Sequence, residues 1–124
     1  VVVVGKDPYA EFEGDSATLQ LPDADLELVR ASSTLGVPVV TILLSGRPVI
    51  VNEILPLSDA VLAAWLPGTE GGGIVDVVYG EVPASGTLSF TWPETVDALP
   101  VSSEEIVPGV LFPRGYGLTY QTST

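Results

Sequence analysis

Apolar residues occur in continuous runs along the first half of the chain, and these runs predict buried strands. The first run, residues 1–4, ends at Gly5. The second covers 38–46 and continues after a kink as 47–51, and the third covers 59–68. Short uninterrupted apolar runs bounded by turn residues are typical of strands in a parallel sheet that is covered on both faces.

Two segments that lie between or after these runs predict helices. The first, LPDADLELVRASSTLG (21–36), has a proline near its start, acids in its first turn and a glycine at its end. Leu26, Val29 and Ser33 would share its inner face. The second follows the glycines of TEGGGIVDVVYGEV (69–82). The order of these elements predicts an α/β fold with a mostly parallel sheet and flanking helices.

The last third of the chain predicts less regular structure. Residues 86–93 are expected to form a strand or an extended segment, and the tail is expected to end in an ordered strand. Tyr116 and Tyr120 would pack on the domain, and proline and glycine predict turns at 107–110 and 113–117.

Composition narrows the chemistry that is available. The 124 residues, 46 % of them hydrophobic, suffice for one globular domain. A net charge of −12, with 16 acids and 4 bases, argues against nucleic acid or an anionic membrane as partner. The chain has neither cysteine nor histidine, so acid–base chemistry must come from carboxylates, tyrosine or lysine. We expect no cofactor and no metal site.

The loop GKDPYAEFEGD (5–15) is the richest candidate for a site. It leaves the carboxyl end of a predicted strand, where ligands of parallel sheets bind. A carboxylic acid serves as a general acid near neutral pH only when burial or nearby negative charge raises its pKa. Residue type alone does not choose among the acids of this loop, and a solvated acidic loop is the simpler interpretation. These acids are Asp7, Glu11, Glu13 and Asp15.

Two further turns follow predicted strands. Arg47, in SGRP, is most simply interpreted as one half of an ion pair that ties a strand end to nearby acids. The glycines of PGTEGGG (67–73) could expose backbone N–H groups to a phosphate. However, the segment lacks the Lys-Ser/Thr pair of a P-loop and Glu70 would repel an anion, so a tight turn is the better interpretation.

Several segments together resemble the C-terminal α/β sandwich domain of family 3 glycoside hydrolases, which are β-glucosidases and exo-β-glucanases. They are VVVVGKDPYAEFEGD, LLSGRPVIV, DAVLAAWLPGTEGGGIVDVVYGE, SGTLSFTWPETVDALP and LFPRGYGLTY. The resemblance implies a retaining, exo-acting hydrolase that releases terminal β-linked glucose from a β-glucoside or β-glucan. Such a mechanism uses two carboxyl groups about 5–5.5 Å apart. The resemblance places the nucleophilic Asp on an N-terminal barrel domain that is absent from this chain.

The resemblance also selects one acid of the loop. The family motif P-Y-x-E-x-x-G-D falls on Pro8, Tyr9, Glu11, Gly14 and Asp15. It implies that Glu11 is the general acid/base and that Tyr9, Gly14 and Asp15 shape the loop. Glu13 falls where the motif sets no residue and is expected to be solvated.

The resemblance bears on the whole molecule as well. Residues 1–124 are expected to be part of the sandwich domain, as a fragment, a processed product or an incomplete record, and inactive alone. The resemblance implies an extracellular or periplasmic location. Two alternatives stay open: a non-catalytic module that binds carbohydrate or protein, and a fragment that associates with itself across an unpaired sheet edge.

Overall fold

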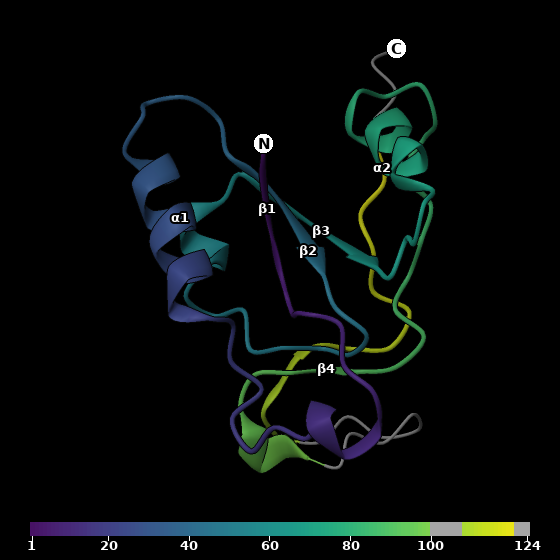
Figure 1. Cartoon of the computed structure of the whole chain (residues 1–124). Coiled ribbons are helices and arrows are strands. Elements are labelled where there is room, and N and C mark those ends of the chain that lie inside the picture. The colour runs from purple at the N-terminus through teal and green to yellow at the C-terminus, as the bar shows by residue number, and fades with distance from the viewer. Residues whose placement is uncertain (100–107, 121–124) are drawn as a thin grey trace. The chain divides into compact units, whose positions relative to one another are not determined.

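The structure, a computed structural model, describes residues 1–99 and 108–120 (Figure 1). The chain divides into two compact units, Val1–Leu66 and Pro67–Thr124. The first unit holds a three-stranded sheet, and the second holds a helix and a two-stranded sheet.

The sheet of the first unit is parallel throughout. Its strands are β1 (Val2–Gly5), β2 (Val40–Leu44) and β3 (Ala60–Trp65), in the order β1-β2-β3. The helix α1 (Asp23–Ser33) connects β1 to β2 and contacts β1. Two parallel strands that lie side by side need a crossover connection of this kind. The parallel sheet and its crossover helix confirm the α/β fold predicted from the sequence.

The strands differ in how far they are buried. Residues 41–43 of the central strand β2 are all buried, as an uninterrupted apolar run predicts. In β1, Val2 and Val4 are buried, but Val3 is 51 % exposed. The expectation that β1 is covered on both faces is therefore wrong for this chain. Residues 1–66 contain a single α-helix, which leaves one face of β1 open.

Helix α1 forms where the sequence predicts it. Val29 is fully buried, while Leu26 and Ser33 on the same face are half-buried. In the first turn, the carboxylate of Asp25 accepts a hydrogen bond of 2.9 Å from the backbone N–H of Gly5. The start of the helix is thus tied to the carboxyl end of β1.

The segment 47–51 is not a strand, although its apolar run predicted one. Pro48 has no N–H to donate to a ladder. Ile50 forms only an isolated parallel bridge with Gln20. Val49 and Val51 are nevertheless buried, so the apolar run reflects burial and not strand pairing. A short 3-10 helix, η2 (Leu55–Leu57), then leads to β3.

The second unit begins with the helix α2 (Gly71–Val78), as the sequence predicts. Strands β4 (Trp92–Pro93) and β5 (Val110–Phe112) pair antiparallel, and the 3-10 helix η3 (Val96–Ala98) follows β4. Of the strand predicted over 86–93, only the last two residues belong to one.

Backbone hydrogen bonds to a turn replace strand pairing before β4. The N–H of Leu88 donates to the carbonyl of Tyr116, and the N–H of Gly115 donates to the carbonyl of Leu88, both at 2.8 Å. Both backbone groups of Leu88 are thus bonded to this turn, and residues 86–91 belong to no strand.

The closing segment is only partly as predicted. Its strand is β5, and residues 113–120 do not continue it. The Tyr116 ring stacks on Phe112 with centroids 4.5 Å apart, and the Tyr120 hydroxyl donates to the Val77 carbonyl. Both tyrosines keep a substantial exposed surface. The turn predicted at 107–110 begins outside the described residues.

Candidate functional site: the acid loop beside the parallel sheet

The acid loop, residues 6–20, leaves β1 at the carboxyl edge of the sheet. A Cβ on Gly5 would lie 2.0 Å from the carbonyl oxygen of Leu44, so the ends of β1 and β2 approach too closely for a side chain. The N–H of Lys6 donates to the same carbonyl at 3.0 Å. The loop therefore starts from a point fixed on β2.

The far end of the acid loop is also fixed. The side chain of Leu19 is buried, and its N–H donates to the Ser16 hydroxyl at 3.1 Å. The N–H of Ile50 donates to the carbonyl of Leu19 at 2.8 Å. Both ends of the acid loop are thus held by residues in or just after β2.

The ring of Tyr9 occupies the space that a side chain at Gly14 would need, and its hydroxyl lies close to Gly46. A Cβ on Gly14 would lie 2.1 Å from Cδ2 of Tyr9, and a Cβ on Gly46 would lie 3.1 Å from its hydroxyl oxygen. Gly14 is buried under this ring. The glycine of the motif is therefore required by the close approach of Tyr9.

Arg47 joins the acid loop to the segment after β2. Its Nε donates to the Tyr9 hydroxyl at 2.9 Å, its Nη2 donates to the carbonyl of Gly14, and its Cζ lies 4.7 Å from the centroid of the Tyr9 ring. The expected ion pair of Arg47 is not found with any acid in the described part of the chain. Arg47 bonds to the Gly14 carbonyl and the Tyr9 hydroxyl in place of a carboxylate. The acids of the loop lie on the exposed surface of the loop.

Glu11 differs from the other three acids of the loop in its backbone. It begins the 3-10 helix η1 (Glu11–Gly14) with a φ of 46°, a left-handed value that none of the other three adopts. Such a conformation costs of the order of 1–3 kcal/mol outside glycine and is often found at functional sites. Leu19 and Trp65 share it; the first belongs to the acid loop and the second ends β3.

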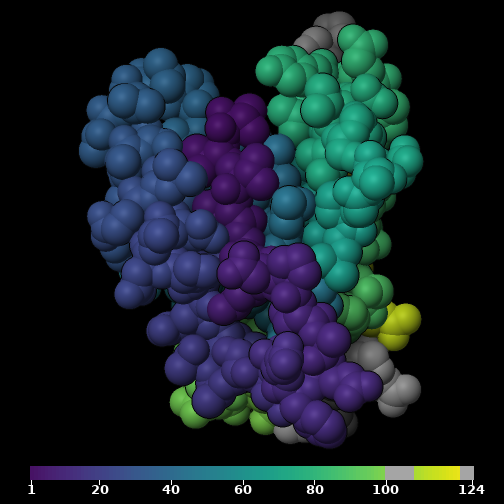
Figure 2. Space-filling model, in the orientation of Figure 1, coloured from purple at the N-terminus to yellow at the C-terminus, as the bar shows by residue number. Residues whose placement is uncertain are grey.

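The tip of the acid loop is open to solvent. Figure 2 shows this part of the chain, in purple, at the molecular surface. Glu11 and Glu13 are exposed, and Phe12 between them is 85 % exposed. Asp15, also exposed, closes η1 by donating its N–H to the carbonyl of Phe12 at 3.0 Å. The geometry fixes the backbone that carries Glu11 and leaves its carboxylate free.

The structure brings together two of the three turns that the sequence placed at strand ends. The acid loop and SGRP meet through Arg47, whereas PGTEGGG belongs to the second unit and leads into α2. Sequence reasoning did not foresee the contacts of Arg47 and Gly46 with Tyr9. The available signal was position, because SGRP follows the strand next to β1 and parallel strands end at the same edge.

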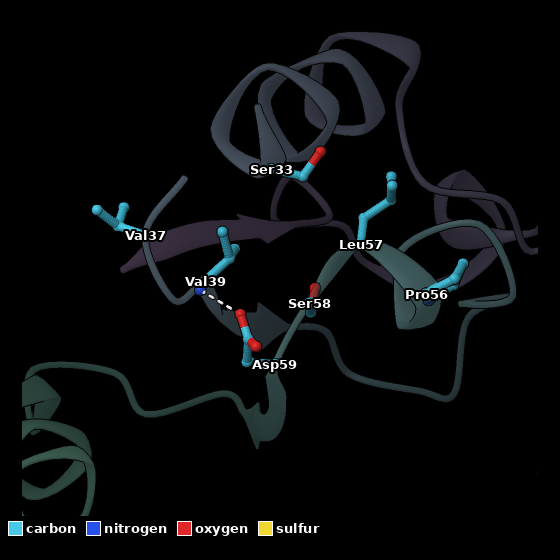
Figure 3. A pocket seen from close by; sticks show the side chains of 7 residues that line it. All are labelled: Ser33, Val37, Val39, Pro56, Leu57, Ser58 and Asp59. Atoms are coloured by element: carbon cyan, nitrogen blue, oxygen red, sulfur yellow. Dashed lines mark hydrogen bonds between the residues drawn. The ribbon is translucent and has the colours of Figure 1, made fainter. Parts of the chain in front are cut away.

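A cavity of about 340 Å³ lies elsewhere in the first unit (Figure 3). It is lined by Ser33, Val37, Val39, Pro56, Leu57, Ser58 and Asp59. The Asp59 carboxylate accepts a 2.7 Å hydrogen bond from the N–H of Val39. Val39 directly precedes β2 and Asp59 directly precedes β3. The cavity therefore lies at the amino ends of these strands, away from the acid loop.

Residues 1–99 and 108–120 contain neither a metal-binding cluster nor a membrane span. No group of three acidic side chains in these ranges could hold a metal ion. No helix within them is both long enough and apolar enough to cross a membrane.

The chain is similar to known hydrolases over nearly its whole length. Residues 1–120 match the glycosyl hydrolase family 3 C-terminal domain. A periplasmic beta-glucosidase of Salmonella typhimurium is 32 % identical over 100 % of this chain and 19 % of its own length. A lysosomal beta glucosidase of Dictyostelium discoideum is 40 % identical over 98 % of this chain and 16 % of its own length. A beta-xylosidase of Formosa agariphila is 33 % identical over 98 % of this chain and 19 % of its own length.

A solved structure agrees in fold. A mutant of the exo-1,3/1,4-beta-glucanase of a Pseudoalteromonas species superposes with a TM-score of 0.88 and 42 % identity, over 98 % of this chain and 21 % of the other. The chain thus spans about a fifth of the length of the proteins that it matches. On its sequence and its fold alike, it belongs to the glycosyl hydrolase family 3 C-terminal domains.

Proposed function

We propose that this chain supplies the general acid/base of a retaining, exo-acting β-glucosidase, and that Glu11 is that residue. One observation carries the proposal: Glu11 is the only acid of the loop with a left-handed backbone, and it lies between Tyr9 and Gly14, which Arg47 holds. Residues in costly backbone conformations persist where surrounding contacts fix them, and they cluster at active sites.

In the proposed mechanism, Glu11 acts twice. A nucleophilic Asp on a barrel domain outside this chain attacks the anomeric carbon while the Glu11 carboxyl gives its proton to the departing glycosidic oxygen. The C–O bond to the leaving group breaks and a glycosyl–Asp ester forms. The Glu11 carboxylate then takes a proton from a water molecule, which attacks the anomeric carbon and releases the sugar and the Asp.

The exposure of Glu11 bears on how it would work as an acid. A carboxyl group that donates a proton near neutral pH needs surroundings that favour its neutral form. Residues 1–66 do not bury Glu11. In our proposal the cover comes from the bound sugar and from the barrel domain, because this chain is about a fifth of the length of its relatives.

The proposed substrate is a terminal β-linked glucose of a glucoside or glucan. The names of the relatives support this class, since two are β-glucosidases and one solved neighbour is an exo-1,3/1,4-β-glucanase. A β-xylosidase among them makes xylosides the substrates to compare. We propose an extracellular or periplasmic location, which the periplasmic relative supports.

The test compares Glu11→Gln with Glu13→Gln in the complete hydrolase. For glucosides with poor leaving groups, Glu11→Gln should lower kcat/KM by about 10²–10⁴-fold, the usual contribution of a general acid. For 2,4-dinitrophenyl β-glucoside, whose leaving group needs no proton, kcat/KM should change little. The Glu13→Gln control should resemble the wild type with both substrates.

Two results would overturn this assignment. Unchanged kinetics of Glu11→Gln with poor leaving groups would remove Glu11 from the mechanism. An equally large, leaving-group-dependent loss in Glu13→Gln would transfer the role to the neighbouring acid.

A further inference from the structure

We propose that Arg47 is a positioning residue, which holds the acid loop so that the Glu11 carboxyl is directed at the glycosidic oxygen. This inference rests on the proposed function of Glu11. It adds a second residue to the reaction, from a different part of the chain and with no direct contact with substrate.

The contacts of Arg47 enclose the turn that carries Glu11. Tyr9 lies two residues before Glu11 and Gly14 three residues after it. Arg47 donates to the hydroxyl of Tyr9 and to the carbonyl of Gly14, and its guanidinium lies over the Tyr9 ring. A planar guanidinium can donate in two fixed directions at once, which a lysine ammonium cannot do with the same geometry.

Arg47 is itself fixed to the sheet. The side chain of Ser45 is buried; its hydroxyl donates to the carbonyl of Arg47 at 2.8 Å and accepts from its N–H at 3.3 Å. The N–H of Ser45 donates to the carbonyl of Trp65, at the end of β3, at 3.2 Å. The position of the arginine therefore follows the carboxyl edge of β2 and β3.

These contacts stabilise a turn that would otherwise be costly. The left-handed backbone of Glu11 needs support from its surroundings, and Arg47 reaches both sides of it. Without Arg47, η1 can relax and carry the carboxyl away from the leaving oxygen. A displacement of about 1 Å can reduce a rate by about 100-fold.

The test measures Arg47→Met and Arg47→Lys in the complete hydrolase with the same two classes of substrate. Because only poor leaving groups need the proton, both variants should lose about 10- to 100-fold in kcat/KM with alkyl glucosides and less than about threefold with 2,4-dinitrophenyl glucoside. Tyr9→Phe, which removes one acceptor of Arg47 and keeps the ring, should give a smaller loss of the same kind.

Arg30→Met is the matched control. Arg30 is an exposed arginine of α1 that pairs with Glu27 at 2.6 Å and with Glu53, both outside the acid loop. Surface ion pairs contribute little, so this variant should keep the wild-type ratio between the two substrates. A ratio changed as much as in Arg47→Met would mean that any lost arginine has this effect.

A second measurement separates positioning from folding. When Arg47→Met is added to Glu11→Gln, it should lower kcat/KM with alkyl glucosides by less than about twofold, because residues that act as a unit are not additive. The inference is overturned if Arg47→Met slows both substrates equally, or if it slows Glu11→Gln as much as the wild type. If Glu11→Gln alone has wild-type kinetics, the proposed function has failed instead.

Discussion

Gly14 and Gly72 are glycines for different physical reasons. At Gly14 the ring of Tyr9 takes the place of a side chain, with 2.1 Å between its Cδ2 and the position of a Cβ. At Gly72, in the first turn of α2, a Cβ would meet nothing within 4 Å. The first glycine is required by packing, whereas the second only loses conformational entropy when the helix forms.

Substitution by alanine should therefore have opposite effects at these two positions. Gly14→Ala should destabilise the protein by about 1–3 kcal/mol, because Tyr9 must leave its place under Arg47. Gly72→Ala should stabilise it by about 0.5–1 kcal/mol through helix propensity. Urea unfolding of both variants measures this; equal tolerance of alanine at the two sites would contradict the packing around Tyr9.

At the scale of single residues, the sequence predicted the motif around Glu11 but not the contacts of Arg47 that hold it. The spacing of Tyr9, Glu11 and Gly14 was visible in the sequence. The partners of Arg47 were not, because an ion pair with one of many acids was the simplest expectation. A backbone carbonyl is an equally good acceptor, but every residue has one, so only the fold selects that of Gly14.

At the scale of elements, apolar runs report burial more reliably than strand pairing. Three strands and two helices were predicted in the right order. The error falls on 47–51, where the chain is partly buried but Ile50 forms only an isolated bridge. Of 86–93, predicted as a strand or an extended segment, only the last two residues belong to a strand. Val49 shows the distinction, since it is fully buried and belongs to no strand.

The central strand should dominate the stability of the first unit. Leu43 in β2 is 1 % exposed, and Leu43→Ala should lower the free energy of unfolding by about 2–5 kcal/mol through lost burial and the cavity left behind. The control is Leu35→Ala, after α1, where the side chain is 70 % exposed and the loss should stay within about 0.5 kcal/mol. Similar losses, measured by urea unfolding, would contradict the described core.

At the scale of the whole molecule, exposed apolar groups lie on the sheet and beside the proposed acid/base. Val3 exposes half of its surface on one face of the sheet, and Phe12 is exposed beside Glu11. The sequence predicted the family and the fold, because motif and hydrophobic pattern are local properties. It does not say what would cover these groups in the proposed hydrolase, since this chain makes up about a fifth of the length of its relatives.

The most direct test of the central claim is product analysis of Glu11→Ala in the complete hydrolase with 2,4-dinitrophenyl β-glucoside and sodium azide. Azide attacks a glycosyl–enzyme intermediate without help from a base, so it can replace water once the Glu11 carboxylate is gone. We predict β-glucosyl azide as the main product of Glu11→Ala, and glucose alone from the wild type and from Glu13→Ala. Azide adducts of Glu13→Ala alone, or of neither variant, would contradict the assignment of Glu11 as the acid/base.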